Sequence, residues 1–181
     1  MPRTIAFLLT AAALFTAGVP SFAQSMKKVN AAGEANFIFS SAAIEKGKEN
    51  QARLKDTFTS NDKIFGRGYF PKALGKLSNG EEFFQWLYID GKLTVKGALV
   101  DVNPTWDQMQ VWLYNTGEDD FSTMSDALKR LPKGRHKVKV AFVRTVYTGS
   151  RKDFNDQGKL VEIKQYKPVN YTVGEFTFIA Q

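Results

Sequence analysis

The segment from Leu131 to Tyr147 constrains the fold of this chain more than any other, because its side chains alternate in character. One set of alternate positions holds His136 and then the apolar residues Val138, Val140 and Phe142. The other set begins with three cations and continues with two apolar residues: Arg135, Lys137, Lys139, Ala141 and Val143. A period of two is typical of a β-strand with one buried and one solvated face. The segment therefore predicts a central strand of an antiparallel sheet.

Short β-rich runs separated by turn residues occupy much of the remaining chain. They lie at 35–40, 63–70, 83–89, 92–102, 108–114, 159–166 and 171–179. Asp90-Gly91 predicts a β-hairpin between two of them, because a type I′ turn needs positive φ at both central residues. A short helix is expected over 122–131, and a polar loop over 148–158. The pattern predicts an all-β fold: a single antiparallel β-sandwich of about eight strands, immunoglobulin-like or jelly-roll-like, with one short helix.

The N-terminus has the character of a secretory signal peptide. Arg3 precedes an apolar run from Ile5 to Val19, and Ser21 and Ala23 fit the −3 and −1 positions of a cleavage site. The run is shorter than the roughly 20 residues of a typical membrane span. We therefore expect export to the periplasm, the cell surface or the medium, and no transmembrane segment in the mature chain. Three parts are predicted, a removed signal peptide, a flexible lead and a β-sandwich domain: 1–23, 24–33 and 34–181.

Several kinds of chemistry are excluded by composition. The chain contains no cysteine, which rules out thiol nucleophiles, thiolate metal sites and disulfide exchange. Its only histidine is His136, so no His-rich site can form. No nucleophile elbow, phosphate-binding glycine loop or zinc-protease motif is present. We predict a protein that is not an enzyme and uses no cofactor, in which His136 serves the scaffold; the alternative is a lone general base beside a carboxylate.

Positive charge is the first candidate for a binding determinant. The chain has 25 Lys and Arg against 18 Asp and Glu, a net charge of +7. Arg135, Lys137 and Lys139 share the solvated face of the predicted central strand, which suits an anionic envelope component such as lipopolysaccharide or phospholipid headgroups. That strand lacks the interleaved aromatic residues of nucleic-acid readers, so nucleic acid is not an expected partner. The alternative is a merely solvated face.

Aromatic side chains are the second candidate. Six of them could form a stacking platform for a sugar ring or a peptide: Tyr69, Trp86, Tyr88, Trp106, Trp112 and Tyr114. Trp112 has the opposite parity to the apolar residues of its strand, and Trp106 follows Pro104 in an expected loop. We predict Trp106 and Trp112 as ligand-stacking residues. The alternative is that both indole rings are buried.

Acidic residues in the expected loops make calcium binding a further possibility. The loop 153–158 has oxygen-bearing side chains at alternate positions and a glycine, as calcium loops do. Lys164 stands where such a loop needs a bidentate Glu, so a hairpin closed by Asp, Asn and Gly turn chemistry is the alternative. The segments 101–107 and 118–120 could also converge on calcium at one end of the fold. None of these is a predicted metal-ligand set.

Two stretches resemble parts of bacterial immunoglobulin-like domains. Leu131-Pro-x-Gly134-x-His136-x-Val138-x-Val140 is similar to their late turn and strand, and Gly174-Glu-Phe-Thr-Phe178 is similar to their final strand. The Cys…Trp…Cys pattern of true immunoglobulin domains is missing. The resemblance therefore implies architecture and carries no function.

Together these features predict an exported, non-catalytic binding module of the bacterial envelope that recognises a protein or an anionic glycan or lipid surface. The predicted binding residues are Trp106, Trp112, Arg135, Lys137 and Lys139. One alternative is a structural protein that adds a strand to a partner through an exposed first or last strand. Another is a calcium-dependent carbohydrate-binding or glycan-acting domain, which would need two carboxyl groups facing one cleft. The oligomeric state stays open.

Overall fold

The structure, a computed structural model, describes residues 35–77, 83–98, 103–117 and 122–181. The predicted signal peptide and flexible lead lie outside the described residues, as do the acidic positions 101 and 118–120. Across the described ranges, no helix combines the length and the apolar character needed to cross a bilayer.

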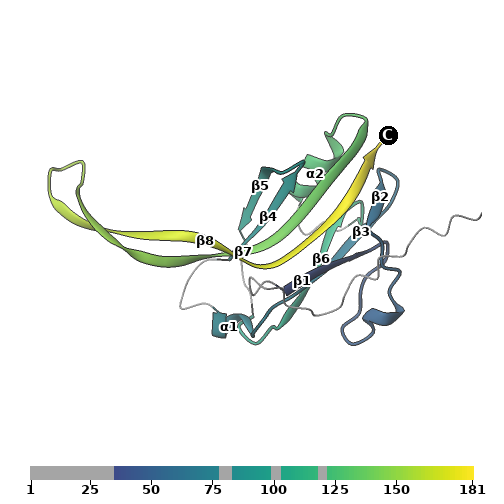
Figure 1. The fold of residues 1–181 in the computed structure, drawn as a ribbon, viewed down its shortest axis with the longest axis horizontal. Helices are drawn as coiled ribbons and strands as arrows, with labels where there is room; N and C mark the ends of the chain where they lie inside the picture. The colour runs from purple at the N-terminus through teal and green to yellow at the C-terminus, as the bar shows by residue number, and fades with distance from the viewer. Residues whose placement is uncertain (1–34, 78–82, 99–102, 118–121) are drawn as a thin grey trace, which may run out of the picture.

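One curled β-sheet forms the body of the protein (Figure 1). Its strands are β1 (Ala35–Ser40), β2 (Thr57–Thr59), β3 (Ile64–Tyr69), β4 (Phe83–Ile89), β5 (Lys92–Ala98), β6 (Gln108–Tyr114), β7 (Gly134–Phe154) and β8 (Leu160–Ala180). Three short helical elements accompany it: the 3₁₀ turn η1 (Glu49–Gln51), α1 (Leu74–Leu77) and α2 (Ser122–Lys129). The all-β class and the predicted short helix at 122–131 are confirmed, whereas β2 and α1 were not predicted.

The sheet order is β5-β4-β7-β8-β1-β3-β6, and β2 also pairs with β8. β1 and β2 run parallel to β8, while the other neighbours are antiparallel. The predicted two-sheet antiparallel sandwich is therefore not confirmed. Instead, a single mixed sheet curls into a half-barrel, because the last strand inserts between β7 and the N-terminal strands. Within the body, β1 lies between β8 and β3, and residues 171–180 of β8 lie between β7 and the strands β1 and β2. Neither the predicted first strand nor the predicted last strand, 171–179, is therefore at an edge of the sheet.

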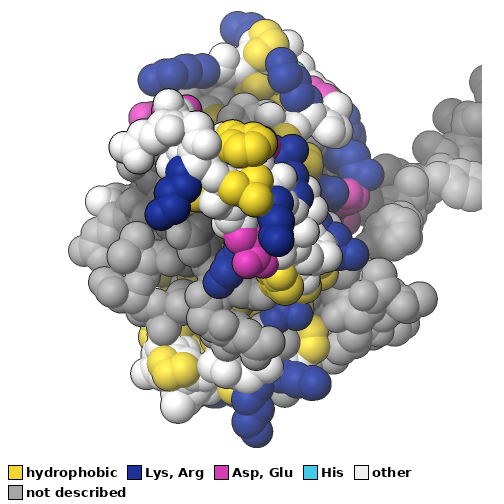
Figure 2. Space-filling view, turned by 90° about the vertical axis from the view of Figure 1, so that its left-hand side faces the viewer, with side chains coloured by type: hydrophobic (Ala, Val, Ile, Leu, Met, Phe, Trp, Pro, Cys, Tyr) yellow, Lys and Arg dark blue, Asp and Glu magenta, His cyan; other side chains and the backbone are white. Residues whose placement is uncertain are grey.

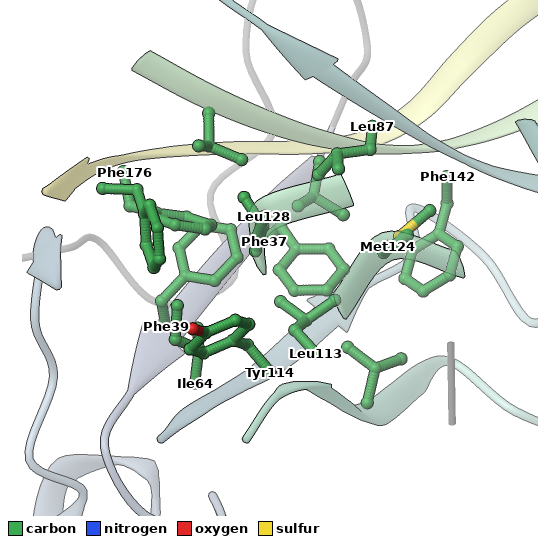
Figure 3. Packing of buried hydrophobic residues seen from close by; sticks show 14 of the residues in the cluster. Phe37, Phe39, Ile64, Leu87, Leu113, Tyr114, Met124, Leu128, Phe142 and Phe176 are labelled. Atoms are coloured by element: carbon green, nitrogen blue, oxygen red, sulfur yellow. The ribbon is translucent and has the colours of Figure 1, made fainter. Parts of the chain in front are cut away.

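The concave side of the sheet holds a core rich in phenylalanine (Figure 3). Phe37 and Phe142 lie 5.3 Å apart between ring centroids, and Met124 and Leu128 of α2 belong to the same cluster. Gly66 and Gly68 of β3 lie beneath these rings: a Cβ at Gly66 would overlap Phe37, and one at Gly68 would overlap Phe142. The absence of side chains on this face of β3 thus accommodates aromatic rings.

β7 is an interior strand between β4 and β8, as the alternating pattern predicts. Val138, Val140 and Phe142 are fully buried on its core face. Ala141 and Val143, of opposite parity, are also fully buried. Within 134–143, only the part up to Lys139 therefore has a solvated face.

A buried arginine fixes the segment 41–56 against the convex side of β1, β3 and β6. The Arg67 guanidinium donates through Nε to the Ile44 carbonyl at 2.8 Å, and Nη2 donates to the same oxygen. It also donates to Gln108 Oε1 at 3.2 Å and to Gln110 Oε1 at 3.1 Å. Burial lowers the pKa of Arg67 from its usual value. Such a strong base stays charged, so the carbonyl and amide oxygens must compensate its lost hydration.

The second half of β7 and the first half of β8 leave the body as a two-stranded ribbon (Figure 1). Arg144 is the last β7 residue paired with β4, and we call residues 145–168 the arm. The loop predicted over 148–158 is therefore strand as far as Phe154. Pro168 lies within β8, where a proline is tolerated because no third strand needs a backbone N–H at this position.

Turn chemistry closes the tip of the arm. Asn155 Oδ1 accepts hydrogen bonds from the backbone N–H groups of Gln157 at 3.1 Å and Lys159 at 2.9 Å. Gly158 has φ +71°, the left-handed conformation that glycine adopts without a steric penalty. The loop 153–158 is thus organised as the hairpin turn that was the alternative to a calcium loop.

Candidate ligand-binding face

Aromatic and basic side chains meet on the convex side of β5, β4 and β7. Along β4 the buried residues Phe83, Leu87 and Ile89 alternate with Trp86 and Tyr88, which are half-buried. Register places Trp86 opposite Lys96 of β5, and Tyr88 opposite Lys139 of β7. We call the combined surface the basic–aromatic face, made of Trp86, Tyr88, Lys96, Arg135, Lys137 and Lys139.

A lysine ammonium group lies over each aromatic ring of this face. Lys96 Nζ lies 5.3 Å from the Trp86 ring centroid, and Lys139 Nζ lies 4.2 Å from that of Tyr88. The two rings are 6.3 Å apart between centroids, inclined at 57°. Cation–π attraction holds both ammonium groups over the rings at about 0.5–1 kcal/mol each when exposed. Burial raises the pKa of Tyr88, so its hydroxyl stays a neutral donor.

The basic side chains continue along β7 to a pocket of about 530 Å³. Lys137 Nζ pairs with Glu175 Oε2 at 2.7 Å, across the β7–β8 ladder. Arg135 lines the pocket, is exposed, and makes no ion pair among the described residues. Its guanidinium is therefore available to an anionic ligand.

His136 and Asp90 form a fixed pair in the same pocket. His136 Nδ1 lies 2.8 Å from Asp90 Oδ2, and Nε2 lies 2.9 Å from the Pro132 carbonyl oxygen. The hydrogen bond to Asp90 and then that to Pro132 raise the pKa of His136. The same bond, followed by the Lys137 N–H, lowers the pKa of Asp90. Both ring nitrogens face acceptors, so the imidazolium is favoured and neither nitrogen points to a substrate as a general base would.

This pair predicts a pH-dependent contribution to stability. Because the pKa of His136 is raised in the folded protein, its contribution to stability is complete below pH 6.5, the ordinary pKa of histidine. That contribution is lost as the pH rises through the higher pKa of the folded state. The lowered pKa of Asp90 makes its contribution present above 3.8 and lost as pH falls through the folded value. We expect the stability difference between wild type and His136→Gln to be larger at about pH 5.5 than at about pH 8.5, measured by urea unfolding.

The control is Asp90→Asn, which removes the carboxylate that holds the imidazolium. In that background the His136→Gln substitution should lose most of its pH dependence, because only the Pro132 carbonyl still favours the charged ring. A wild-type advantage that is equal at both pH values would show that His136 is neutral in the folded protein.

The two tryptophans predicted to stack on a ligand lie at another part of the sheet. Trp106 is exposed in the loop before β6, and its carbonyl accepts from the Leu74 N–H at 2.8 Å. Trp112 is half-buried and pairs in register with Phe65 of β3. Strands β8, β1 and β3 lie between β6 and β7 in the sheet order. The structure therefore does not bring Trp106 and Trp112 together with Arg135, Lys137 and Lys139.

Among the other aromatics, Tyr69 and Tyr114 are buried, which leaves Trp86 and Tyr88 beside the basic residues. Counting back from the Asp90-Gly91 turn would have placed Trp86 one residue away from Lys96. A register shift between Leu87 and Tyr88 brings these two opposite one another. The sequence patterns do not indicate this bulge.

No group of three or more His, Cys, Asp or Glu side chains suited to a metal ion occurs within the described ranges. Asn103 Oδ1 caps its own loop through the Thr105 N–H and hydroxyl, and Asp107 pairs with Lys46 at 3.3 Å. These two residues of the possible calcium cluster thus have local structural partners. Its other members, Asp101 and 118–120, lie outside the described residues.

No protein-family model, no curated protein and no solved structure matches the chain. The likeness to bacterial immunoglobulin-like domains therefore stays a prediction from two short stretches of sequence.

Proposed function

We propose that the protein is an exported, non-catalytic binding module whose basic–aromatic face binds an anionic surface of the bacterial envelope. The observation that carries the proposal is the in-register alternation of cations and aromatic rings across β5, β4 and β7. The sequence supplied the cations of β7 without interleaved aromatics. The neighbouring strand β4 provides the missing rings.

The chemistry of the face suits a ligand with negative charges on an apolar or ring-shaped frame. Its four cations are Lys96, Arg135, Lys137 and Lys139; Glu175 pairs with Lys137, and Asp56 and Asp90 also line the pocket beside Arg135 and Lys137. Ammonium and guanidinium groups attract phosphate or carboxylate, while the half-buried rings offer apolar contact to a sugar ring or acyl chain. Phospholipid headgroups and phosphorylated glycans share this chemistry.

Binding is favoured over catalysis by the state of the pocket's acidic groups. A general acid needs a raised pKa, whereas that of Asp90 is lowered by His136. Glu175 is engaged by Lys137. These two carboxylates therefore do not favour the glycan-acting alternative, and Asp56, the third carboxylate of the pocket, accepts from the Thr57 hydroxyl at 3.2 Å. Assembly through the predicted first or last strand would need an open edge at 35–40 or 171–179, and both segments have neighbouring strands on two sides.

The test compares wild type with Arg135→Ala/Lys139→Ala. Each basic residue near an anionic surface contributes about 1 kcal/mol, so the double variant should bind about 30-fold more weakly. Binding would be measured by co-sedimentation with vesicles containing anionic phospholipid and, separately, with lipopolysaccharide, at several salt concentrations. Raising the ionic strength should weaken wild-type binding steeply. The stronger of the two bindings identifies the source of the anionic groups.

Lys72→Ala/Lys76→Ala is the matched control, since it removes the same net charge from exposed lysines outside the face. It should retain nearly wild-type affinity. Equal loss in both variants would mean that only overall charge matters. Equal binding to neutral vesicles, or no loss in the Arg135/Lys139 variant, would contradict the proposal.

A further inference from the structure

Most of the exposed bulk hydrophobic surface of the described residues is on the arm. Six large hydrophobic side chains are exposed among the described residues. Five of the six lie within 145–168: Tyr147 (48%), Phe154 (69%), Leu160 (52%), Ile163 (38%) and Tyr166 (49%). Viewed from the side on which the arm projects, hydrophobic and basic side chains lie next to one another (Figure 2). Exposed hydrophobic groups gathered on one projection mark an interaction site.

Register places four of these five side chains on one face of the arm. Directly opposed residues share a face, and the pairs are Phe154 with Leu160, Lys152 with Glu162, Ser150 with Lys164, and Tyr147 with Tyr166. The ring centroids of Tyr147 and Tyr166 are 5.9 Å apart, and the Ser150 hydroxyl donates to Glu162 Oε1. We call this surface the arm face; Ile163 lies on the opposite side.

A β-bulge is what brings Tyr147 onto the arm face. By simple alternation, Tyr147 would point away from Ser150, Lys152 and Phe154. The register shifts between Tyr147 and Gly149, and Gly149 has φ +138°, a conformation that side-chain-bearing residues rarely adopt. The extra residue, Thr148, reverses the alternation and adds a tyrosine to the face that carries Phe154.

We propose that the arm face binds the arm face of a second copy of this chain, in an antiparallel, two-fold symmetric dimer. Each of the four cross-strand pairs forms one row across the ribbon. A two-fold axis that crosses the ribbon between the Ser150 and Lys152 rows places each strand on the same strand of the second copy, running in the opposite direction. Tyr147 then meets the partner copy's Phe154, and Tyr166 meets Leu160. Lys164 meets Glu162, so opposite charges face each other twice. The order of the four rows is complementary to itself when reversed, and this observation favours a second copy of the chain as the partner.

A two-stranded ribbon with both faces in water also lacks the support that hairpins need. Isolated hairpins are marginally stable, and a third layer or strand is usually required. Stacking two arms supplies that layer without breaking any ladder hydrogen bond. The proposal is independent of the basic–aromatic face, which lies on the body.

The arm's charges favour a partner of mixed sign over an anionic membrane. Its five cations are accompanied by three carboxylates, Asp153, Asp156 and Glu162. About half of the surface of each of the four apolar side chains is exposed, so together they offer roughly 400 Å² per arm, if a whole side chain presents about 200 Å². A stable complex buries about 800 Å² per partner, so a weak, concentration-dependent dimer is expected.

The test is sedimentation velocity from about 5 μM to about 500 μM, a range that spans weak association. The average mass should rise from the monomer towards the dimer. Phe154→Ala should weaken dimerisation at least about tenfold, because symmetry removes two contacts. Ile163→Ala, the matched control on the opposite side, should leave it unchanged.

Charge reversal separates a pairing role from a structural one. Lys164→Glu and Glu162→Lys should each be monomeric, since each places like charges against one another. Mixed together, they should form heterodimers, because opposite charges then meet at both positions. A monomer at every concentration overturns the proposal. So does association that Phe154→Ala does not weaken, or a monomeric protein whose arm instead binds anionic vesicles.

Discussion

Gly174→Ala is expected to destabilise the protein by about 3 kcal/mol or more, a fall in melting temperature of about 10 °C. A methyl group there would overlap the Phe37 carbonyl oxygen of β1 and lie 2.7 Å from Phe37 Cβ and 2.8 Å from Phe39 Cε2. A flexible side chain could turn aside, but a backbone carbonyl moves only if β1 and β8 separate. Urea unfolding monitored by far-UV circular dichroism would measure the loss.

Gly158→Ala is the control for the glycine change itself. Gly158 has φ +71° and no atom within 4 Å of an added Cβ, so only the left-handed backbone is strained. That costs about 1 kcal/mol. If the two variants lost equal stability, the close approach of β1 to β8 would not be the cause.

Arg67→Met is expected to destabilise the protein by about 3 kcal/mol and to release the segment 41–56. Hydrogen bonds from a charged donor contribute about 1.5–3 kcal/mol, and the orphaned Ile44 carbonyl adds a further penalty. Methionine retains much of the volume, so cavity formation is a small part of the loss. Gln110 Oε1 also accepts from the Ile44 N–H at 3.1 Å. The segment would therefore lose its hydrogen bonds to Arg67 and keep this weaker attachment.

Lys46→Met provides the comparison from the same segment. Lys46 pairs with Asp107 at 3.3 Å, with both side chains largely exposed. Exposed ion pairs contribute about 0–1 kcal/mol, so stability should barely change. Limited proteolysis should cut within 41–56 faster in Arg67→Met than in Lys46→Met or wild type. Equal cleavage rates in all three proteins would show that Arg67 does not anchor the segment.

The strands whose side chains alternate between the core and solvent were the ones that the sequence predicted most directly. β4, β6 and the first half of β7 are marked by apolar residues that the core requires at alternate positions. The arm has no core face, and its β7 half, 148–154, is polar and was predicted as part of a loop, whereas its β8 half, 159–166, was predicted as a strand. The parallel pairing of β1 and β2 with β8 also escapes prediction, because register between distant segments leaves no local signal.

The candidate site could be predicted only in part, for the same reason. Arg135, Lys137 and Lys139 share a face through simple alternation within one strand. Their aromatic neighbours Trp86 and Tyr88 come from another strand, through a bulged register. Trp106 and Trp112 were predicted from an expected loop and from parity, yet β8, β1 and β3 separate β6 from β7 in the strand order. Proximity across strands depends on topology, which alternation within one strand does not encode.

The interior position of β8 has a consequence for how the chain reaches its folded state. β8 joins the strands β5, β4 and β7 to β1, β3 and β6, and it is the last element of the chain. Until these final residues arrive, the two halves cannot meet, and each leaves an edge open to aggregation. Pairing the first strand with the last also gives a high contact order, which slows folding. Deleting residues 171–180 would therefore divide the sheet at its centre.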